Sequence, residues 1–172
     1  MASKILTKTT RGFATGLFAM AMVFTAVAPA ASEVTVEQAY TQITGPELQG
    51  LMQDWGYRAE LDVDNVGDPK ITSNSNGVSY AVFFYECDDQ TPKQCGSLGL
   101  SISFDLETPF DIARINEWNL TKRFASAALD DEGDPKLEMS VNVVGGVTAK
   151  GLREWFDWWE TGLGEFLQHI DW

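Results

Sequence analysis

"GVSYAVFFYECDDQTPKQCGSLGLSISFDL", residues 77–106, predicts two neighbouring β-strands joined by a short polar loop. The first strand, "GVSYAVFFYEC", is apolar on both faces in its middle, which is typical of a central strand. The second strand, "SLGLSISFDL", alternates between apolar and small or polar residues. Its apolar positions are Leu98, Leu100, Ile102, Phe104 and Leu106. Antiparallel pairing of the two strands would bring Cys87 and Cys95 together across their connection.

A helix is expected on each side of this hairpin in the sequence. Residues 45–57, "GPELQGLMQDWGY", repeat apolar residues at helical spacing, and Thr44 can cap the first turn. Residues 107–124, "ETPFDIARINEWNLTKRF", also predict a helix, because Thr108 followed by Asp111 resembles a capping box.

The most regular pattern is "TAKGLREWFDWWETGLGEFLQHIDW", residues 148–172, which predicts a long amphipathic helix. Its apolar stripe consists of Leu152, Trp155, Phe156, Trp159, Leu163, Phe166, Leu167 and Ile170. Residues 57–64 and 69–75 have the pattern of short strands, and residues 124–130 and 135–143 that of a second hairpin. The expected order is α-ββββ-α-ββ-α. It predicts an α+β fold in which helices cover an antiparallel sheet.

The N-terminal residues have the features of a secretory signal peptide. Basic residues and no acid precede the apolar run 13–27, and "APA" at residues 28–30 resembles a cleavage site. The alternative is an uncleaved membrane anchor, but the run is short for a membrane span. We therefore expect cleavage after Ala30.

Cleavage would divide the chain into a signal peptide (1–30), an extended or loosely helical lead-in (31–43) and one domain (44–172). Removing the three basic residues of the signal leaves nine Lys and Arg against 25 Asp and Glu, a net charge of −16. Such a chain repels phosphate backbones and anionic lipids, which argues against nucleic acid and a peripheral membrane role. The predicted location is the periplasm, with no membrane anchor after cleavage.

Cys87 and Cys95 are the two cysteines of the chain. In an exported protein, an even number of closely spaced cysteines is typical of a disulfide. A metal pair is the alternative, but two thiolates need further ligands, and the single histidine, His169, lies far away in the sequence. We therefore predict a disulfide at the mouth of the hairpin and no metal site.

An acidic stretch, "DDEGDPK" at residues 130–136, has two interpretations, a calcium loop and a hairpin turn. Counted from Asp130, an EF-hand would need glycine at its sixth position and glutamate at its twelfth. Those positions hold Pro135 and Val141. The related "NVGDPKI" at residues 65–71 also follows an expected strand, and glycine suits a turn that needs positive φ. The sequence favours a turn and leaves a weak surface calcium site open.

The sequence offers no pattern for catalysis. It has one histidine, no nucleophile motif around any serine and no phosphate-binding glycine loop. Carboxylate pairs leave a hydrolase open as an alternative, because 25 acidic residues give many chance pairs. We predict no catalytic residue and no cofactor.

Two tryptophans are candidates for contact with a protein partner. Trp158 lies off the apolar stripe of the last helix, and Trp172 is the terminal residue. A large aromatic residue on the solvent side of a helix is a candidate for binding another protein. The alternative is that Trp158 folds over a strand edge or a gap at Gly162, since single exposed apolar residues are ordinary.

Residues 115–148 carry a specific run of features. They are Asn116-x-Trp118-Asn119, Lys122-Arg123-Phe124, Leu129-Asp130, Gly133-Asp134-Pro135, Leu137-Glu138 and Gly145-Gly146. In these features the chain resembles the YbjN-like family, described as putative bacterial sensory transduction regulators. The segments "FFYECDD" and "CGSL" also resemble exported members with a paired cysteine. The resemblance covers about residues 44–168. The family has no agreed activity, so the resemblance carries over no binding residues.

The family's fold is similar to that of type III secretion chaperones, in which helices pack on an antiparallel sheet and chains often pair into dimers. Those chaperones bind unfolded stretches of other proteins, so the resemblance implies a protein partner and a possible homodimer. This chain departs from them in its export signal. Our hypothesis is an exported, non-enzymatic protein-binding or regulatory domain. The alternatives are a small periplasmic hydrolase that uses paired carboxylates and a structural envelope protein without a defined ligand.

Overall fold

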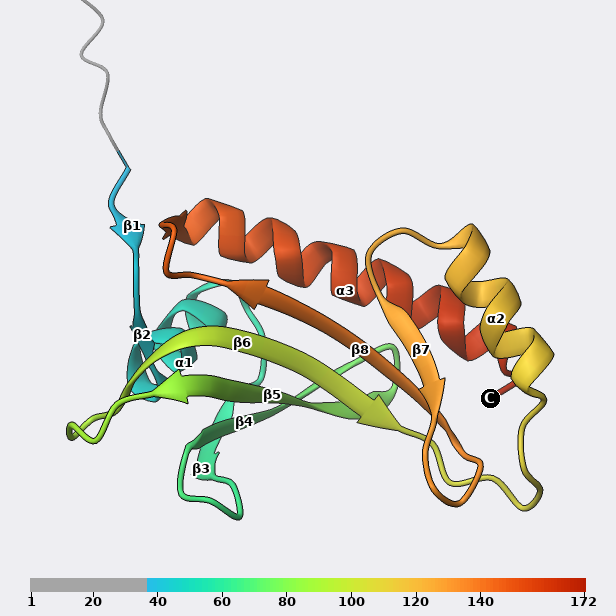
Figure 1. The fold of residues 1–172 in the computed structure, drawn as a ribbon. Helices are drawn as coiled ribbons and strands as arrows, with labels where there is room; N and C mark the ends of the chain where they lie inside the picture. Colours follow the sequence, from blue (N-terminus) through green and yellow to red (C-terminus); the bar gives the residue numbers. More distant parts are fainter. Residues whose placement is uncertain (1–36) are drawn as a thin grey trace, which may run out of the picture. The chain divides into compact units, whose positions relative to one another are not determined.

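The computed structural model describes residues 37–172 (Figure 1). The predicted signal peptide (1–30) and the first part of the predicted lead-in lie outside the described residues. In chain order the elements are β1 (Ala39–Tyr40), β2 (Ile43–Thr44), α1 (Gly45–Asp54), β3 (Glu60–Val63), β4 (Pro69–Ser75), β5 (Val78–Cys87), β6 (Gln94–Ser103), α2 (Ile112–Thr121), β7 (Ser126–Leu129), β8 (Pro135–Asn142), β9 (Val147–Thr148) and α3 (Ala149–His169).

The main sheet is antiparallel and has the strand order β3-β4-β5-β6-β8-β7. The chain leaves β6, forms α2, and returns as the β7–β8 hairpin, so that β8 lies beside β6 and β7 lies outside β8. The predicted α+β fold and its order of elements are confirmed. Three strands of two residues each, β1, β2 and β9, come in addition, because β2 pairs with the start of β6 and β1 with β9. The described end of the lead-in is thus extended.

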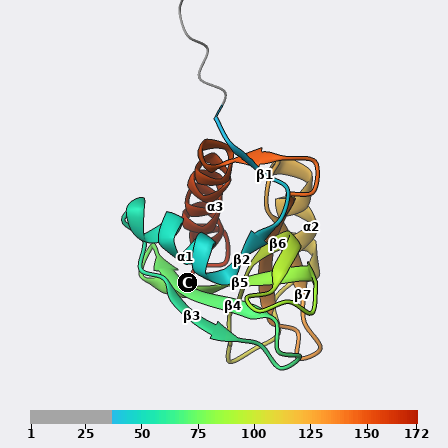
Figure 2. The ribbon, with the colours of Figure 1, turned by 90° about the vertical axis from the view of Figure 1, so that its left-hand side faces the viewer.

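The helices lie on one side of the sheet (Figure 2). α3 runs along this side, and the predicted stripe faces the sheet: seven of its eight residues are buried and Leu167 is half-buried. The strands bury alternate residues against it, as predicted for Leu98, Leu100 and Ile102 of β6. α1 begins with the capping box of Thr44 and Glu47, so Thr44 is the cap that the sequence predicted. Burial of these apolar faces is the main source of the stability of the fold.

The central hairpin is closed by the predicted disulfide. Cys87 and Cys95 are directly opposite each other in the register of β5 and β6, and their sulfur atoms are bonded. The Asp88 carboxylate accepts hydrogen bonds from the backbone N–H groups of Gln90 (3.1 Å) and Gln94 (3.0 Å) inside the connecting loop. The disulfide and this carboxylate together fix the shape of the loop.

We expect the unreduced protein to have a mass two hydrogens lower than the dithiol form, as measured by mass spectrometry without reductant. Replacing both cysteines by serine should lower the free energy of unfolding by about 2 kcal/mol, because the unfolded chain regains the freedom of the short loop. Two thiols that react freely with an alkylating agent in the native protein would contradict the prediction.

The second helix begins later than predicted. The sequence predicted a helix over 107–124 with a capping box at Thr108 and Asp111, whereas α2 has Asp111 as its N-cap. The Asp111 carboxylate accepts a hydrogen bond from the Ala113 N–H (2.9 Å). The segment before it is held elsewhere, because the Phe110 N–H donates to the carbonyl of Gly133 (2.9 Å). A contact between distant segments thus overrides the local signal for a helix start.

α2 also closes the outer edge of β7. The Trp118 indole N–H donates to the carbonyl of Ala125 (2.9 Å), and the Asn119 side chain bonds both the N–H and the carbonyl of Ala127 (2.8 Å each). The Asn119 amide therefore takes the place that a further strand would have. An edge that is closed in this way offers few groups to another chain.

Candidate functional site

The two acidic turns of the chain have the same structure. In residues 64–68 and 130–134, the first aspartate accepts hydrogen bonds from two backbone N–H groups of its own turn, and the glycine has positive φ. The N–H of Asp68, followed by those of Val66 and Gly67, holds the pKa of the Asp64 carboxyl below its ordinary value. The turn interpretation of the acidic stretch is confirmed. Within residues 37–172, no set of three or more His, Cys, Asp or Glu side chains is arranged to hold a metal ion.

Removing the exposed charges of the second turn should therefore change the stability of the fold little. For the double variant Asp131→Asn, Glu132→Gln we expect a free energy of unfolding within about 0.5 kcal/mol of the parent, because both side chains are exposed. Calcium should leave the melting temperature of both proteins unchanged, measured against a chelator. A calcium-dependent rise that the double variant loses would show that this turn binds calcium, because a ligand of the native state raises its stability.

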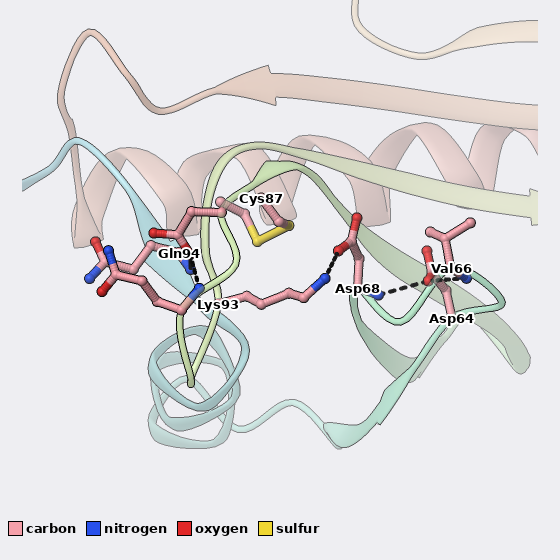
Figure 3. Close-up of polar contacts among 9 residues, drawn as sticks. Asp64, Val66, Asp68, Cys87, Lys93 and Gln94 are labelled. Carbon is pink, nitrogen blue, oxygen red and sulfur yellow. Dashed lines mark hydrogen bonds and ion pairs between the residues drawn. A yellow bond between two sulfur atoms is a disulfide. The ribbon is translucent and has the colours of Figure 1, made fainter.

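The second aspartate of each turn holds a neighbouring loop. The Asp68 carboxylate pairs with the Lys93 ammonium (2.7 Å), which extends from the loop of the disulfide (Figure 3). The buried Asp134 carboxylate accepts a hydrogen bond from the backbone N–H of Leu106 (3.0 Å), in the connection from β6 to α2. Each turn thus connects its hairpin to a loop from another part of the chain.

A hollow of about 550 Å³ lies beside the ion pair of Asp68 and Lys93. The start of α1, the β3–β4 hairpin and the disulfide loop line it, and most of the lining is apolar. Its lining includes Pro46, Leu61, Val63, Pro69 and Pro92. Val63 is 61% exposed and the nearby Val66 79% exposed, which are high values for aliphatic side chains. Exposed apolar residues around a concave surface favour contact with a ligand or a partner.

Another hollow, of about 540 Å³, contains the acidic side chains that best fit the hydrolase alternative. Asp157 and Glu160, one turn apart on α3, lie near the phenol of Tyr57. The Tyr57 hydroxyl is 3.4 Å from the Asp157 carboxylate, and the Ser75 hydroxyl donates to Glu160 (3.0 Å). Glu160 is therefore already engaged in a contact between the sheet and α3. His169, by contrast, has its Nε2 2.8 Å from the carbonyl of Arg114, so it joins α3 to α2.

The half-buried Tyr57 and the buried Tyr80 should ionise late. Burial, followed by the nearby charges of Glu160 and Asp157, raises the pKa of Tyr57, and burial raises the pKa of Tyr80 to about 12. An unfolded tyrosine ionises near pH 10, so the unfolded state loses protons first and the native state loses stability as the pH rises above about 10. We expect the near-ultraviolet absorbance of tyrosinate to appear together with unfolding. Titration of all tyrosines near pH 10 in a still folded protein would contradict this.

Trp158, a predicted binding residue, lies in an aromatic surface that we define as Phe124 and Trp158. Its ring stacks on that of Phe124, with centroids 4.3 Å apart and planes 12° apart. Trp158 remains 43% exposed and Phe124 49%. A small groove of about 130 Å³ adjoins the stacked rings, with Arg123 and Gly162 in its lining. The stacking partner is thus an aromatic side chain of the α2–β7 connection.

Trp172, the other predicted binding residue, lies apart from this surface. Its ring packs edge-on against Phe104 (4.9 Å between centroids), and it is 56% exposed. Sequence reasoning identified Trp158 because it lies off the apolar stripe of α3. It missed Phe124, which lies in the connection that follows α2. The positions of the two exposed valines were also missed, because each lies near a turn that was read only as a reversal of the chain.

Comparison with known proteins gives one clear result. Residues 46–172 match a family model whose description is "Putative bacterial sensory transduction regulator". No curated protein matches the chain. Among residues 37–172, no helix combines the length and the apolar character that a membrane crossing needs. The match covers nearly all of the described domain, including both acidic turns, the disulfide loop and the aromatic surface.

Proposed function

The chain belongs to the YbjN family, described as putative bacterial sensory transduction regulators, and on this premise we propose that it is an exported, non-enzymatic domain that binds a protein partner. The N-terminal signal pattern and the disulfide support export, since disulfides persist in oxidising compartments. The periplasm is the proposed location.

The aromatic surface is the observation that carries the binding role. Its two rings are already stacked, so little side-chain freedom is lost when a partner covers them. Tryptophan and other aromatic residues contribute strongly when they are buried in an interface. Binding is therefore favoured when a partner excludes water from this surface.

The charges around the aromatic surface indicate the chemistry of the partner. Lys122 is paired with Glu165 (2.7 Å), whereas Arg123 makes no ion pair among residues 37–172. Arg123 lines the groove next to the stacked rings. We propose a partner segment that places an apolar side chain against Trp158 and a carboxylate against Arg123, because guanidinium groups bind carboxylates well.

The test is capture of a partner from periplasm with the tagged mature chain. The double variant Phe124→Ser, Trp158→Ser should lose a stoichiometric partner that the parent retains. Val144→Ser is the matched control, because Val144 is also exposed (57%) but lies after β8. Trp172→Ser tests the second predicted residue separately. Equal capture by the parent and the double variant would refute the aromatic surface as the contact.

Two further outcomes belong to the same experiment. If the chain pairs with itself through the aromatic surface, light scattering would give twice the monomer mass for the parent and the monomer mass for the double variant. Turnover of a substrate by the parent, lost in Asp157→Asn or Glu160→Gln, would favour the hydrolase alternative. A chain with neither partner nor turnover would fit a structural role in the envelope.

A further inference from the structure

The two margins of the sheet, β3 and β7, differ although their hairpins end in the same turn. Leu61 lies three residues before Asp64, and Ala127 lies three residues before Asp130, so the two positions correspond. In both turns the N–H of the first aspartate bonds the carbonyl of the second (2.8 and 2.9 Å). Hydrogen-bonded pairs alternate along an antiparallel ladder. The backbone groups of Leu61 and Ala127 therefore point outward, away from the sheet.

At β7 the outward-pointing backbone groups are hydrogen-bonded, whereas in the middle of β3 they are not. Ala127 is bonded by Asn119, as described above. At β3 the Gln49 amide binds the carbonyl of Ala59 (3.1 Å), and the Asp62 carboxylate accepts the N–H of Val63 (2.9 Å). Between them, the N–H and carbonyl of Leu61 have no side-chain or loop partner within residues 37–172. The β3 edge is thus capped at both ends and open in the middle.

The surroundings of this open position combine apolar and acidic side chains. Leu61 and Val63 point to the side of the large hollow, which they line. Alternation along β3 turns the Asp62 side chain toward the other face of the sheet, although Asp62 also borders the hollow. Asp62 makes no ion pair among the described residues, and Asp89 lies on the rim of the hollow. Among the nearby cations, Arg58 pairs with Glu60 and Lys93 with Asp68. Lys70 of β4 lies opposite Asp62 in the register, makes no ion pair among the described residues, and has its ammonium 5.6 Å from the centre of the Phe83 ring. The β3 edge is therefore apolar on one face and carries the unpaired Asp62 carboxylate on the other.

A second copy of the chain fits this edge poorly. Antiparallel pairing of two β3 strands around Leu61 would bring Glu60 and Asp62 of one copy next to those of the other. Like charges on opposed strands destabilise a ladder. The charge pattern instead matches a strand that carries cations on that face and apolar side chains on the side of the hollow.

We propose that the edge of β3 accepts an extended segment of a partner protein in which apolar residues alternate with lysine or arginine. The backbone of the segment bonds the N–H and carbonyl of Leu61 and continues the sheet beyond β3, which lies at its margin in Figures 1 and 2. Its apolar side chains enter the hollow beside Val63, and its cations face Asp62. This inference rests on the proposed protein-binding role but uses a surface separate from the aromatic one.

The experiment uses the purified mature chain and a labelled peptide of about eight residues, the length of a typical strand, that alternates lysine and valine. A peptide of the same composition with the lysines grouped at one end, and one that alternates glutamate and valine, are the comparisons. Fluorescence anisotropy should show tighter binding of the alternating lysine peptide than of both others. Hydrogen exchange should slow in residues 58–66 when it binds. Equal binding of the grouped peptide would overturn the proposal, since charge alone would then explain binding.

Two variants test the two parts of the contact. Leu61→Pro removes the outward N–H and should abolish binding, while circular dichroism reports whether the fold is kept. Asp62→Lys keeps the backbone N–H groups. It should lower the affinity for the lysine peptide by about tenfold and raise the affinity for the glutamate peptide. Asp131→Lys is its matched control, because it makes the same change of charge at the other turn. An equal loss of affinity for the lysine peptide in Asp62→Lys and Asp131→Lys would overturn the proposal. This comparison stays valid even if Leu61→Pro does not fold.

The outcome is independent of the aromatic surface. If the Phe124→Ser, Trp158→Ser variant binds the peptide like the parent but still captures the natural partner, the proposed function through that surface fails and the β3 edge stands. Dimerisation of the parent that Leu61→Pro abolishes would assign the edge to a second copy of the chain and refute the proposal.

Discussion

Replacing Trp118 by alanine is expected to lower the free energy of unfolding by about 3–5 kcal/mol. Trp118 is 1% exposed, and its ring packs edge-on against Phe166 of α3, with centroids 4.9 Å apart. Its indole N–H also donates to the carbonyl of Ala125. The substitution therefore leaves a cavity between α2 and α3 and removes the partner of a backbone carbonyl. Urea unfolding of the two proteins, followed by fluorescence, measures the difference.

Trp158→Ala is the matched control for this prediction. Trp158 also stacks on an aromatic ring, but it is 43% exposed, so its loss should cost about 1 kcal/mol. Trp118→Phe should have an intermediate effect, because it keeps most of the packing and loses the hydrogen bond. If the alanine variants at the two positions lose equal stability, Trp118 does not join α2 to α3 and β7 as described.

Replacing Gly133 by valine should cost about 3 kcal/mol, the sum of backbone strain and crowding. Gly133 has a φ of +85°, which a β-branched residue resists. A Cβ atom at this position would also lie 3.0 Å from the Cβ of Pro109. The connection that starts α2 would thus be pushed away from the turn. Urea unfolding again gives the value.

Gly67→Val separates the two contributions, because the twin turn provides the same backbone without the contact. Gly67 has a φ of +86°, and a Cβ there would meet nothing within 4 Å. This variant should lose only the strain, about 1–2 kcal/mol. A larger loss at Gly67 than at Gly133 would contradict the assigned role of Pro109.

The main strands and helices could be predicted because their side chains follow simple periods. The alternation through Leu100 and Ile102 placed one face of β6 in the core, and the stripe that includes Trp155 and Trp159 placed one side of α3 there. The start of α2 could not be predicted. It depends on the bond between Phe110 and Gly133, two segments that meet only in the folded chain. The strands β1, β2 and β9 are too short to show any period.

The candidate sites were predictable only in part. Trp158 stood out because it interrupts a regular stripe, but its stack on Phe124 joins residues 34 positions apart in the sequence. The open position at Leu61 needs the strand order, since a strand reveals its unoccupied groups only once its neighbours are known. The repeated turn was visible in the sequence. The difference between the two sheet edges was not visible in the sequence, because Asn119, which closes the edge of β7, lies on a helix.

The position of α3 in the chain also has a consequence for the order in which the protein forms. Synthesis proceeds from the N-terminus, so every strand of the sheet exists before α3 follows β9. Until then, the apolar face with Val82, Leu98 and Leu100 has no long helix to cover it. Partly formed sheets with bare apolar faces aggregate readily. A nascent chain that has completed β8 but lacks α3 thus has the apolar face of the sheet only partly covered, and it is most prone to aggregate at that stage.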